Sequence, residues 1–368
     1  MLNTKITTCI ILSLSLIHGL PRSHPTLQAR GVTLTSSNIL PMHSPAFLPK
    51  FPPLNLKPVQ PPPTGPIQRI SRLRRQDYPE NWVSPDIQHP EVQAAIKSID
   101  WEHVPKLKPQ TGGDSSYDID QDEACWWTRS QCTTPKVSYL PEDVSACPKR
   151  GDFALTYDDG PLSPQRPNDP WAEPRLYDFL ALHHQRATLF YIGSNVVAFP
   201  DAAIRAYQSG HTLCAHTWSH PKMTSLTNEA IVAELYWSVR AIKEATGVTP
   251  RCWRPPYGDV DDRVRAIAHQ FGFYTLLWNS DSFDWGLPSS ANGFGGVYTQ
   301  DQVDSYFQAW VNERNEDTDE EGRVVLEHET SNMTVLTSER WLEKLQKVFR
   351  VKTMHECEPL LPGPYWEV

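Results

Sequence analysis

The chain has 368 residues, of which 43 are acidic and 34 basic, so its formal net charge is −9 at neutral pH. This charge argues against binding to nucleic acid or to an anionic membrane surface. The length suffices for one large domain with extensions, and a hydrophobic share of 39% suffices for a substantial core.

The first residues of the chain have the pattern of a secretory signal. Lys5 precedes a short apolar run over residues 7–17, whereas a membrane span needs ~20 apolar residues. We therefore predict a signal peptide over residues 1–20, with an uncleaved anchor as the alternative. The mature protein is expected to be secreted, extracellular or associated with a cell wall, and to have no contact with a membrane.

Residues 21–110 form a separate region by composition. Ten prolines fall between positions 41 and 66, which favours extended chain and hinders packing. We expect a Pro-rich, largely disordered segment, with one short helix at 91–100. The pair Arg74-Arg75 is either a processing site or a solvated charge run.

The cysteines support export. Cys9 lies in the predicted signal, and an even number in the rest of a secreted chain predicts disulfides. Six cysteines allow fifteen connectivities; we expect the pairs Cys132–Cys147, Cys214–Cys252 and Cys125–Cys357. Asn332 begins the sequence Asn332-Met333-Thr334 and is a predicted glycosylation site.

Residues 111–368 are expected to form one domain in which strand and helix patterns alternate. Strands are predicted at 153–157, 187–192, 211–215, 273–278 and 323–328, and helices at 174–183, 227–245, 261–270, 301–312 and 338–349. Thr227 is a predicted helix cap and Gly247 a predicted helix stop. The alternation predicts an α/β fold with a mainly parallel sheet, open or closed into a barrel. Such folds carry their chemistry at the carboxyl ends of the strands.

Two blocks of sequence indicate a metal site. The first is Thr156-Tyr157-Asp158-Asp159-Gly160-Pro161, in which one aspartate can bind a metal and the other can accept a proton. The second is His216-Thr217-Trp218-Ser219-His220, whose two imidazoles can reach the same ion. One carboxylate and two imidazoles with an open position are typical of catalytic zinc sites.

These blocks resemble the polysaccharide deacetylases of carbohydrate esterase family 4, and most of all the fungal chitin deacetylases. The resemblance covers residues 151–349 and includes three further blocks, at 254–259, 281–285 and 326–329. The sequence departs from the usual family pattern at Tyr157, where Phe is usual, and at Glu329, where Asp is usual. The resemblance implies a single catalytic domain with the distorted (β/α) barrel of the NodB homology type.

The resemblance also assigns roles around the metal. Asp159, His216 and His220 are expected to hold Zn²⁺, with Co²⁺ or Ni²⁺ as alternatives. Asp158 is expected to be the catalytic base, and Arg254 to orient it.

Further roles concern the substrate. His328 is the expected general acid, held by Asp284. The backbone N–H of Tyr257 is expected to bind the oxyanion, Trp285 to wall a sugar subsite and Leu326 to line the pocket for the acetyl methyl group.

The implied reaction is hydrolysis of N-acetyl groups of chitin, partly deacetylated chitosan or chito-oligosaccharides, which releases acetate and leaves glucosamine units. A metal-bound water is the expected nucleophile. Two alternatives stay open, an O-deacetylase of xylan-like polysaccharides and a non-catalytic chitin-binding relative. The loops 162–173 and 286–300 are expected to shape the sugar subsites.

Overall fold

The protein is described here by a computed structural model. It describes residues 38–52, 54, 56–60, 62, 73–110, 117–162, 174–288 and 296–367. The predicted signal peptide, most of the loop 162–173 and the middle of the loop 286–300 lie outside the described residues. Within the described part, no helix combines the length and the apolar character that a membrane span requires.

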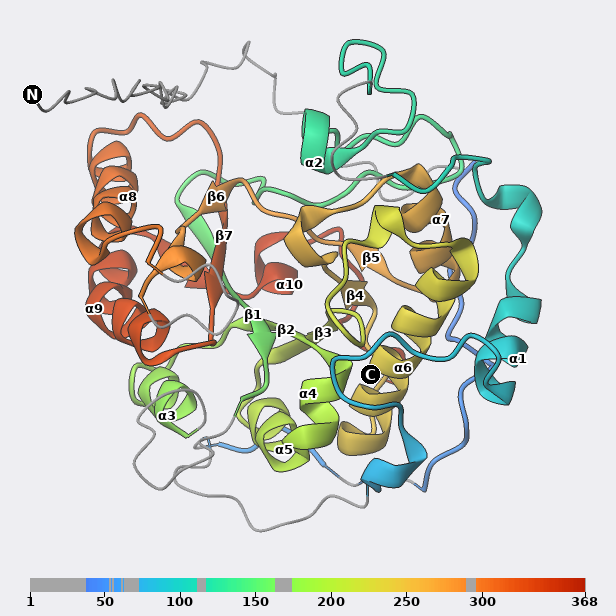
Figure 1. Ribbon diagram of the computed structural model, residues 1–368. Helices are drawn as coiled ribbons and strands as arrows, with labels where there is room; N and C mark the ends of the chain where they lie inside the picture. The colour runs from blue at the N-terminus through green and yellow to red at the C-terminus, as the bar shows by residue number, and fades with distance from the viewer. Residues whose placement is uncertain are drawn as a thin grey trace, which may run out of the picture. The chain divides into compact units, whose positions relative to one another are not determined.

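A curled parallel sheet forms the centre of the fold, with helices packed outside it (Figure 1). The strand order is β5-β4-β3-β2-β1-β7-β6, and β8 also pairs with β1. The strands are β1 (Asp152–Gly160), β2 (Thr188–Tyr191), β3 (Thr212–Ala215), β4 (Cys252–Trp253), β5 (Tyr274–Thr275), β6 (Ser280–Asp281), β7 (Arg323–His328) and β8 (Arg350–Lys352). The expected distorted (β/α) barrel is thereby confirmed.

The register of the sheet explains where the functional side chains gather. Asp158 of β1 lies opposite His328 of β7 and Phe190 of β2, and all these pairings are parallel. The carboxyl ends of the strands therefore meet on one side of the sheet.

The helices largely follow the predicted pattern. They are α1 (Pro90–Ser98), α2 (Trp127–Ser130), α3 (Arg175–Leu182), α4 (Gly193–Ala198), α5 (Pro200–Gln208), α6 (Asn228–Thr246), α7 (Asp262–Gln270), α8 (Gln300–Asn315), α9 (Asn332–Val348) and α10 (Met354–Cys357). The Thr227 side chain caps α6, and Gly247 ends it with a φ of 81°. Helix α9 begins six residues before its predicted start, because Ser331 and Thr334 form a capping box there.

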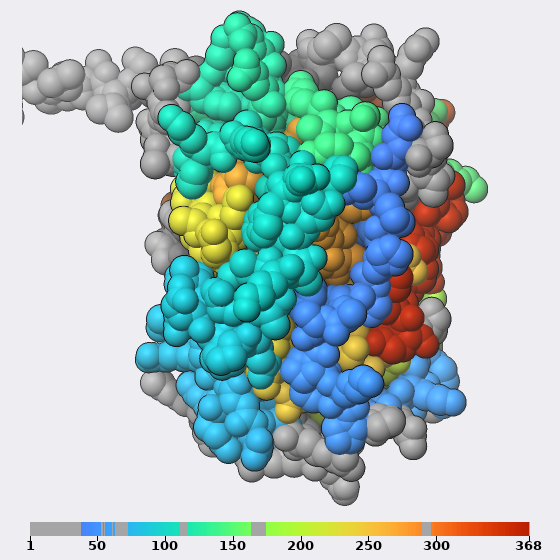
Figure 2. Space-filling model, turned by 90° about the vertical axis from the view of Figure 1, so that its right-hand side faces the viewer, coloured from blue at the N-terminus to red at the C-terminus, as the bar shows by residue number. Residues whose placement is uncertain are grey.

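The prediction that residues 21–110 are largely disordered is wrong for residues 73–110, which we call the N-terminal arm. Its Val92, Ala95 and Ile99 are buried in the main core, and α1 packs against α6. Arg240 of α6 donates to the Glu91 carboxylate at 2.7 Å. Figure 2 shows the arm, in cyan, lying over the face of the molecule. The Pro-rich composition ends at position 66, and helical spacing of apolar residues follows it. The prediction also fails around Leu48, which lies inside the Pro-rich stretch and is buried in the same core.

The structure corrects two of the three expected disulfides. Cys214–Cys252 is confirmed, and it joins neighbouring strands β3 and β4. The expected pairs Cys132–Cys147 and Cys125–Cys357 are wrong, because Cys125 bonds to Cys132 and Cys147 bonds to Cys357.

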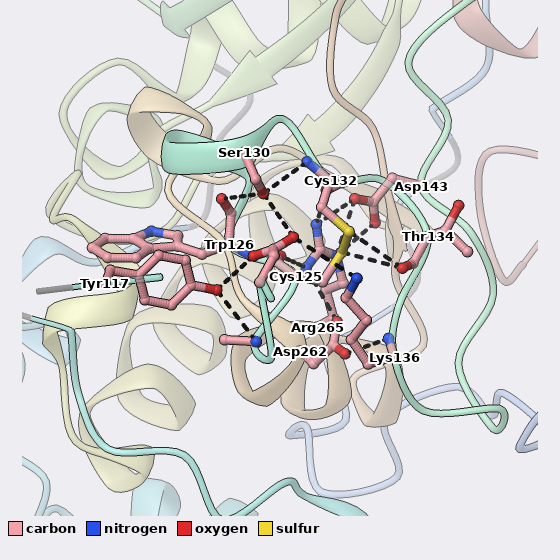
Figure 3. Close-up of a disulfide and its surroundings, with 12 residues drawn as sticks. Tyr117, Cys125, Trp126, Ser130, Cys132, Thr134, Lys136, Asp143, Asp262 and Arg265 are labelled. Carbon is pink, nitrogen blue, oxygen red and sulfur yellow. Dashed lines mark hydrogen bonds and ion pairs between the residues drawn. A yellow bond between two sulfur atoms is a disulfide. The ribbon is translucent and has the colours of Figure 1, made fainter. Parts of the chain in front are cut away.

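The fold explains both corrected pairs. Cys125 and Cys132 flank the short helix α2, which brings their Cα atoms to 5.1 Å (Figure 3). Helix α10 packs against β1 and brings Cys357 to within a Cα distance of 5.4 Å from Cys147. Both distances suit a disulfide. No pattern in the sequence around these cysteines predicts that either pair lies close together.

Candidate metal centre and active site

A cavity of about 310 Å³ opens at the carboxyl ends of the central strands. Aspartates, histidines and aromatic rings share its wall. The lining residues are Asp158, Asp159, His216, His220, Tyr257, Trp278, Asp281, Trp285, Leu326 and His328. Eight of these ten are residues for which the sequence predicted a role in the site.

Asp159, His216 and His220, which we call the metal-ligand cluster, converge at one point of the cavity wall. Oδ1 of Asp159 lies 3.1 Å from Nε2 of His220 and 3.4 Å from Nε2 of His216. This oxygen is buried and has no hydrogen-bond partner among the described residues. Burial raises the pKa of Asp159, but the imidazoles of His220 and His216 outweigh burial and hold the pKa well below its usual range. The donor set fits a divalent cation such as Zn²⁺.

The histidine loop, residues 216–220, is oriented by contacts behind it. Nδ1 of His216 donates to the backbone oxygen of Arg254 at 2.7 Å, so that Nε2 is left as the ligand atom. Glu234 of α6 accepts from the backbone N–H groups of Trp218 and Ser219 at 2.9 and 2.8 Å. The ring of His216 and the backbone of the loop are thereby held in place.

Asp158 is fixed by a buried arginine. Nη1 of Arg254 donates to Oδ1 of Asp158 at 2.7 Å and to Oγ1 of Thr156 at 2.8 Å. Nη2 and Nε of Arg254 donate to the backbone oxygens of Leu277 and Leu276. The second oxygen of Asp158, Oδ2, lies 3.7 Å from Nε2 of His216. A carboxylate held in this way beside a metal-ligand cluster can accept a proton from water.

His328 lies across the cavity and is held by a second carboxylate. Its Nδ1 donates to Oδ1 of Asp284 at 2.7 Å, and its backbone N–H donates to Oδ2 of Asp284 at 2.8 Å. Burial by itself lowers the pKa of His328, but Asp284, Asp159 and Asp158 raise it to about 10. These carboxylates favour the protonated form of the ring, which can serve as a proton donor.

The three residues expected to contact substrate also line this cavity. Tyr257 lies in the short turn after β4 with a φ of 59°, and the residue is 45% exposed. Leu326 is buried in the cavity wall. Trp285 packs edge-on against Tyr298, with ring centroids 5.4 Å apart. The structure thus brings every predicted catalytic, metal-binding and substrate-binding residue to one site.

Comparison with known proteins agrees with this geometry. Residues 145–276 match the polysaccharide deacetylase family. The chain contains a polysaccharide deacetylase domain.

Two curated relatives and one solved structure extend this result. A chitin deacetylase of Amylomyces rouxii is 37% identical over 287 residues, which cover 75% of this chain and 64% of the relative. Chitin deacetylase 2 of Cryptococcus neoformans var. grubii is 42% identical over 229 residues, 62% of this chain and 48% of the relative. The structure of the chitin deacetylase from the fungal pathogen Colletotrichum lindemuthianum aligns with a TM-score of 0.51 at 25% identity, over 61% of this chain and 94% of that chain.

The chain therefore spans about half to two thirds of the length of these curated relatives. The resemblance to carbohydrate esterase family 4 that the five sequence blocks indicated is confirmed. The fold of the deacetylase domain agrees with the solved chitin deacetylase.

Sequence reasoning missed several residues that support the deacetylase domain from behind. Asn195 of α4 donates from Nδ2 to the backbone oxygen of Asp159 at 2.8 Å. Asp259 accepts four hydrogen bonds, from Trp126, Thr128 and the N–H and hydroxyl of Thr224. Asp259 lies inside the third sequence block, so its position could have indicated a role in the site. Asn195 and Glu234 lie outside the blocks, and nothing in the sequence pointed to them.

Proposed function

We propose that the protein is a metal-dependent N-deacetylase of chitin. One observation carries the proposal. The metal-ligand cluster has an arginine-held carboxylate, Asp158, on one side and a carboxylate-held imidazole, His328, across the same cavity. Hydrolysis of an amide needs a base for water and an acid for the leaving amine, and this site offers both. The names of the curated relatives point to chitin.

We infer that Asp159, His216 and His220 hold Zn²⁺. The buried, unpartnered Oδ1 of Asp159 and the two imidazole nitrogens near it are the ligand atoms. When bound, the ion supplies Lewis acidity at the substrate carbonyl and lowers the pKa of water.

In the proposed reaction, Asp158 takes a proton from the attacking water. Arg254 holds this carboxylate by one oxygen, so the other oxygen is directed toward the cluster. The backbone N–H of Tyr257 stabilises the negative oxygen that develops on the carbonyl.

His328 then protonates the leaving amine. Protonation matters because an amine anion is a very poor leaving group. Asp284 orients the ring and stabilises its charged form. Trp285 and Leu326 form apolar walls for the sugar and for the methyl of the acetyl group.

The proposed substrates are chitin, chito-oligosaccharides and partly deacetylated chitosan. The net charge of −9 suits chitosan as a cationic polymer and does not oppose neutral chitin. A secreted, extracellular or wall-associated location stays a prediction from the N-terminal sequence, and so does glycosylation at Asn332.

The test is mass spectrometry of chitin oligosaccharides after incubation with the enzyme. We expect products that have lost acetyl groups, no products after a chelator has removed the metal, and recovery after addition of zinc. Acetate release from acetylated xylan without release from chitin would identify an O-deacetylase instead. Binding of chitin without acetate release from either polymer would identify a non-catalytic relative.

A further inference from the structure

Trp82 is an exposed tryptophan in the N-terminal arm, outside the region that matches the polysaccharide deacetylase family. The residue is 52% exposed, and its backbone φ is 63°. A positive φ is uncommon for a bulky residue and persists only where surrounding contacts hold it. An indole left half in water and held in this conformation is a candidate ligand-binding surface.

Two hydrogen bonds through Asn195 connect Trp82 to the metal-ligand cluster. Its Nε1 donates to Oδ1 of Asn195 at 3.1 Å, and Nδ2 of the same asparagine donates to the backbone oxygen of Asp159 at 2.8 Å. One side chain of α4 thus joins the indole to a residue of the metal-ligand cluster. The arm passes close to α4 in Figure 1.

The chain just before Trp82 is fixed to the histidine loop. The backbone oxygen of Glu80 accepts from Nε1 of Trp218 at 3.3 Å. The ring of Tyr78 stacks on that of Trp218 with centroids 5.9 Å apart. These contacts hold the arm, so the position of the indole does not depend on its own packing alone.

Exposed aromatic surface therefore borders the metal-ligand cluster on the side of β3 and β4. The Trp82 ring lies 6.3 Å from the ring of His220, which lies 4.7 Å from the ring of Tyr257. Trp285, in contrast, follows β6, which lies on the other side of β1 in the sheet. Aromatic rings thus lie on both sides of the point at which an acetyl group would react.

We propose that Trp82 forms a sugar-binding subsite for a ring of N-acetylglucosamine next to the ring that is deacetylated. A pyranose ring has faces of C–H groups that pack on an aromatic surface, while its hydroxyl groups at the edges stay in water. A fixed indole loses little conformational freedom when a sugar binds. This inference rests on the proposed function, because it takes a polymer of N-acetylglucosamine as the ligand.

The kinetic test compares zinc-loaded wild-type enzyme with Trp82→Ala and Trp82→Phe on N-acetylglucosamine and on chitin oligosaccharides from dimer to hexamer. We expect Trp82→Ala to lower kcat/KM for the hexamer about tenfold more than for the single sugar, which has no neighbouring ring, mainly through KM. Trp82→Phe keeps an aromatic face but cannot donate to Asn195, and should recover much of the loss. Leu182→Ala, which removes a 74% exposed residue of α3, is the control and should match wild type.

Equal losses for the single sugar and the hexamer, or a kcat effect alone, would overturn the subsite, because they would make Trp82 only a support for Asp159. Failure of the proposed function is a separate result, since then wild type releases no acetate from any oligosaccharide.

Calorimetric titration of the hexamer into Asp158→Asn and into Asp158→Asn/Trp82→Ala reads the subsite without turnover. Binding about tenfold weaker in the double variant supports the subsite. Equal affinities contradict it.

Discussion

Asp158 and Asp159 are neighbours in sequence but occupy different environments. Successive side chains of a regular strand point to opposite faces, yet both carboxylates line one cavity. The cause is an irregularity at the end of β1, where the pairing with β2 shifts between Asp158 and Gly160 and Asp159 has a φ of 72°. Bulges of this kind redirect side chains near active sites.

His211 predicts how stability responds to acid. Burial, Arg205 and Arg186 lower the pKa of His211 to about 3, and its Nδ1 accepts from the backbone N–H of Ala187. The unfolded chain binds a proton near pH 6.5 but the folded chain does not. The contribution of His211 to the free energy of unfolding is therefore complete above pH 6.5. It falls by about 1.4 kcal/mol for each pH unit as the pH is lowered toward 3.

Urea unfolding at pH 7, 5.5 and 4.5 measures this effect. His211→Gln keeps an acceptor but cannot be protonated, so its urea midpoint should fall less with pH than that of wild type. An identical pH dependence of the two proteins would show that protonation of His211 does not contribute to the loss of stability in acid.

At this scale the sequence predicted the residues that gather at the candidate site, but not those that hold them in place. Asp158, His216 and His328 belong to motifs with chemical meaning. Asn195 and Glu234 act through hydrogen bonds to backbone atoms of other segments, and such contacts arise only from the fold.

Among the elements, long amphipathic segments were predictable and short ones were not. Helix α6 has 19 residues, a threonine cap and a glycine stop, all visible in the sequence. Strands β4 and β6 have two residues each and carry no periodic signal. The N-terminal arm was misjudged because the proline-rich composition before it was extended over a segment that packs.

The loop of residues 254–259 yields a prediction about how elements position the site. Asp259 accepts hydrogen bonds from α2 and from Thr224, and thereby clamps the loop that carries Arg254 and Tyr257. Asp259→Ala leaves buried donors unsatisfied and should destabilise the fold by about 2–4 kcal/mol. Denaturant unfolding and acetate release should both report the loss.

Glu320→Ala, which removes an exposed carboxylate, is the control and should resemble wild type. If Asp259→Ala had wild-type stability and activity, the hydrogen bonds of Asp259 would not be needed to hold the loop of residues 254–259.

For the whole molecule, the disulfides should contribute unequally to the free energy of unfolding. Cys147–Cys357 spans a sequence separation of 210, and Cys125–Cys132 spans 7. Loop-closure entropy alone predicts contributions of about 5 and about 2 kcal/mol, respectively. Guanidinium unfolding of the double variants Cys147→Ala/Cys357→Ala and Cys125→Ala/Cys132→Ala should follow this order, and the reverse order would contradict it.

The central claim, a metal-assisted deacetylation with Asp158 as base, is tested most directly in the Asp158→Asn variant. Zinc content by elemental analysis and acetate release from chitin hexamer should be measured on the same preparation. We predict one zinc per chain, as in wild type, and a loss of turnover of about 10³-fold or more, in the upper part of the range for general base catalysis. Full activity, or loss of the zinc together with the activity, would contradict this assignment.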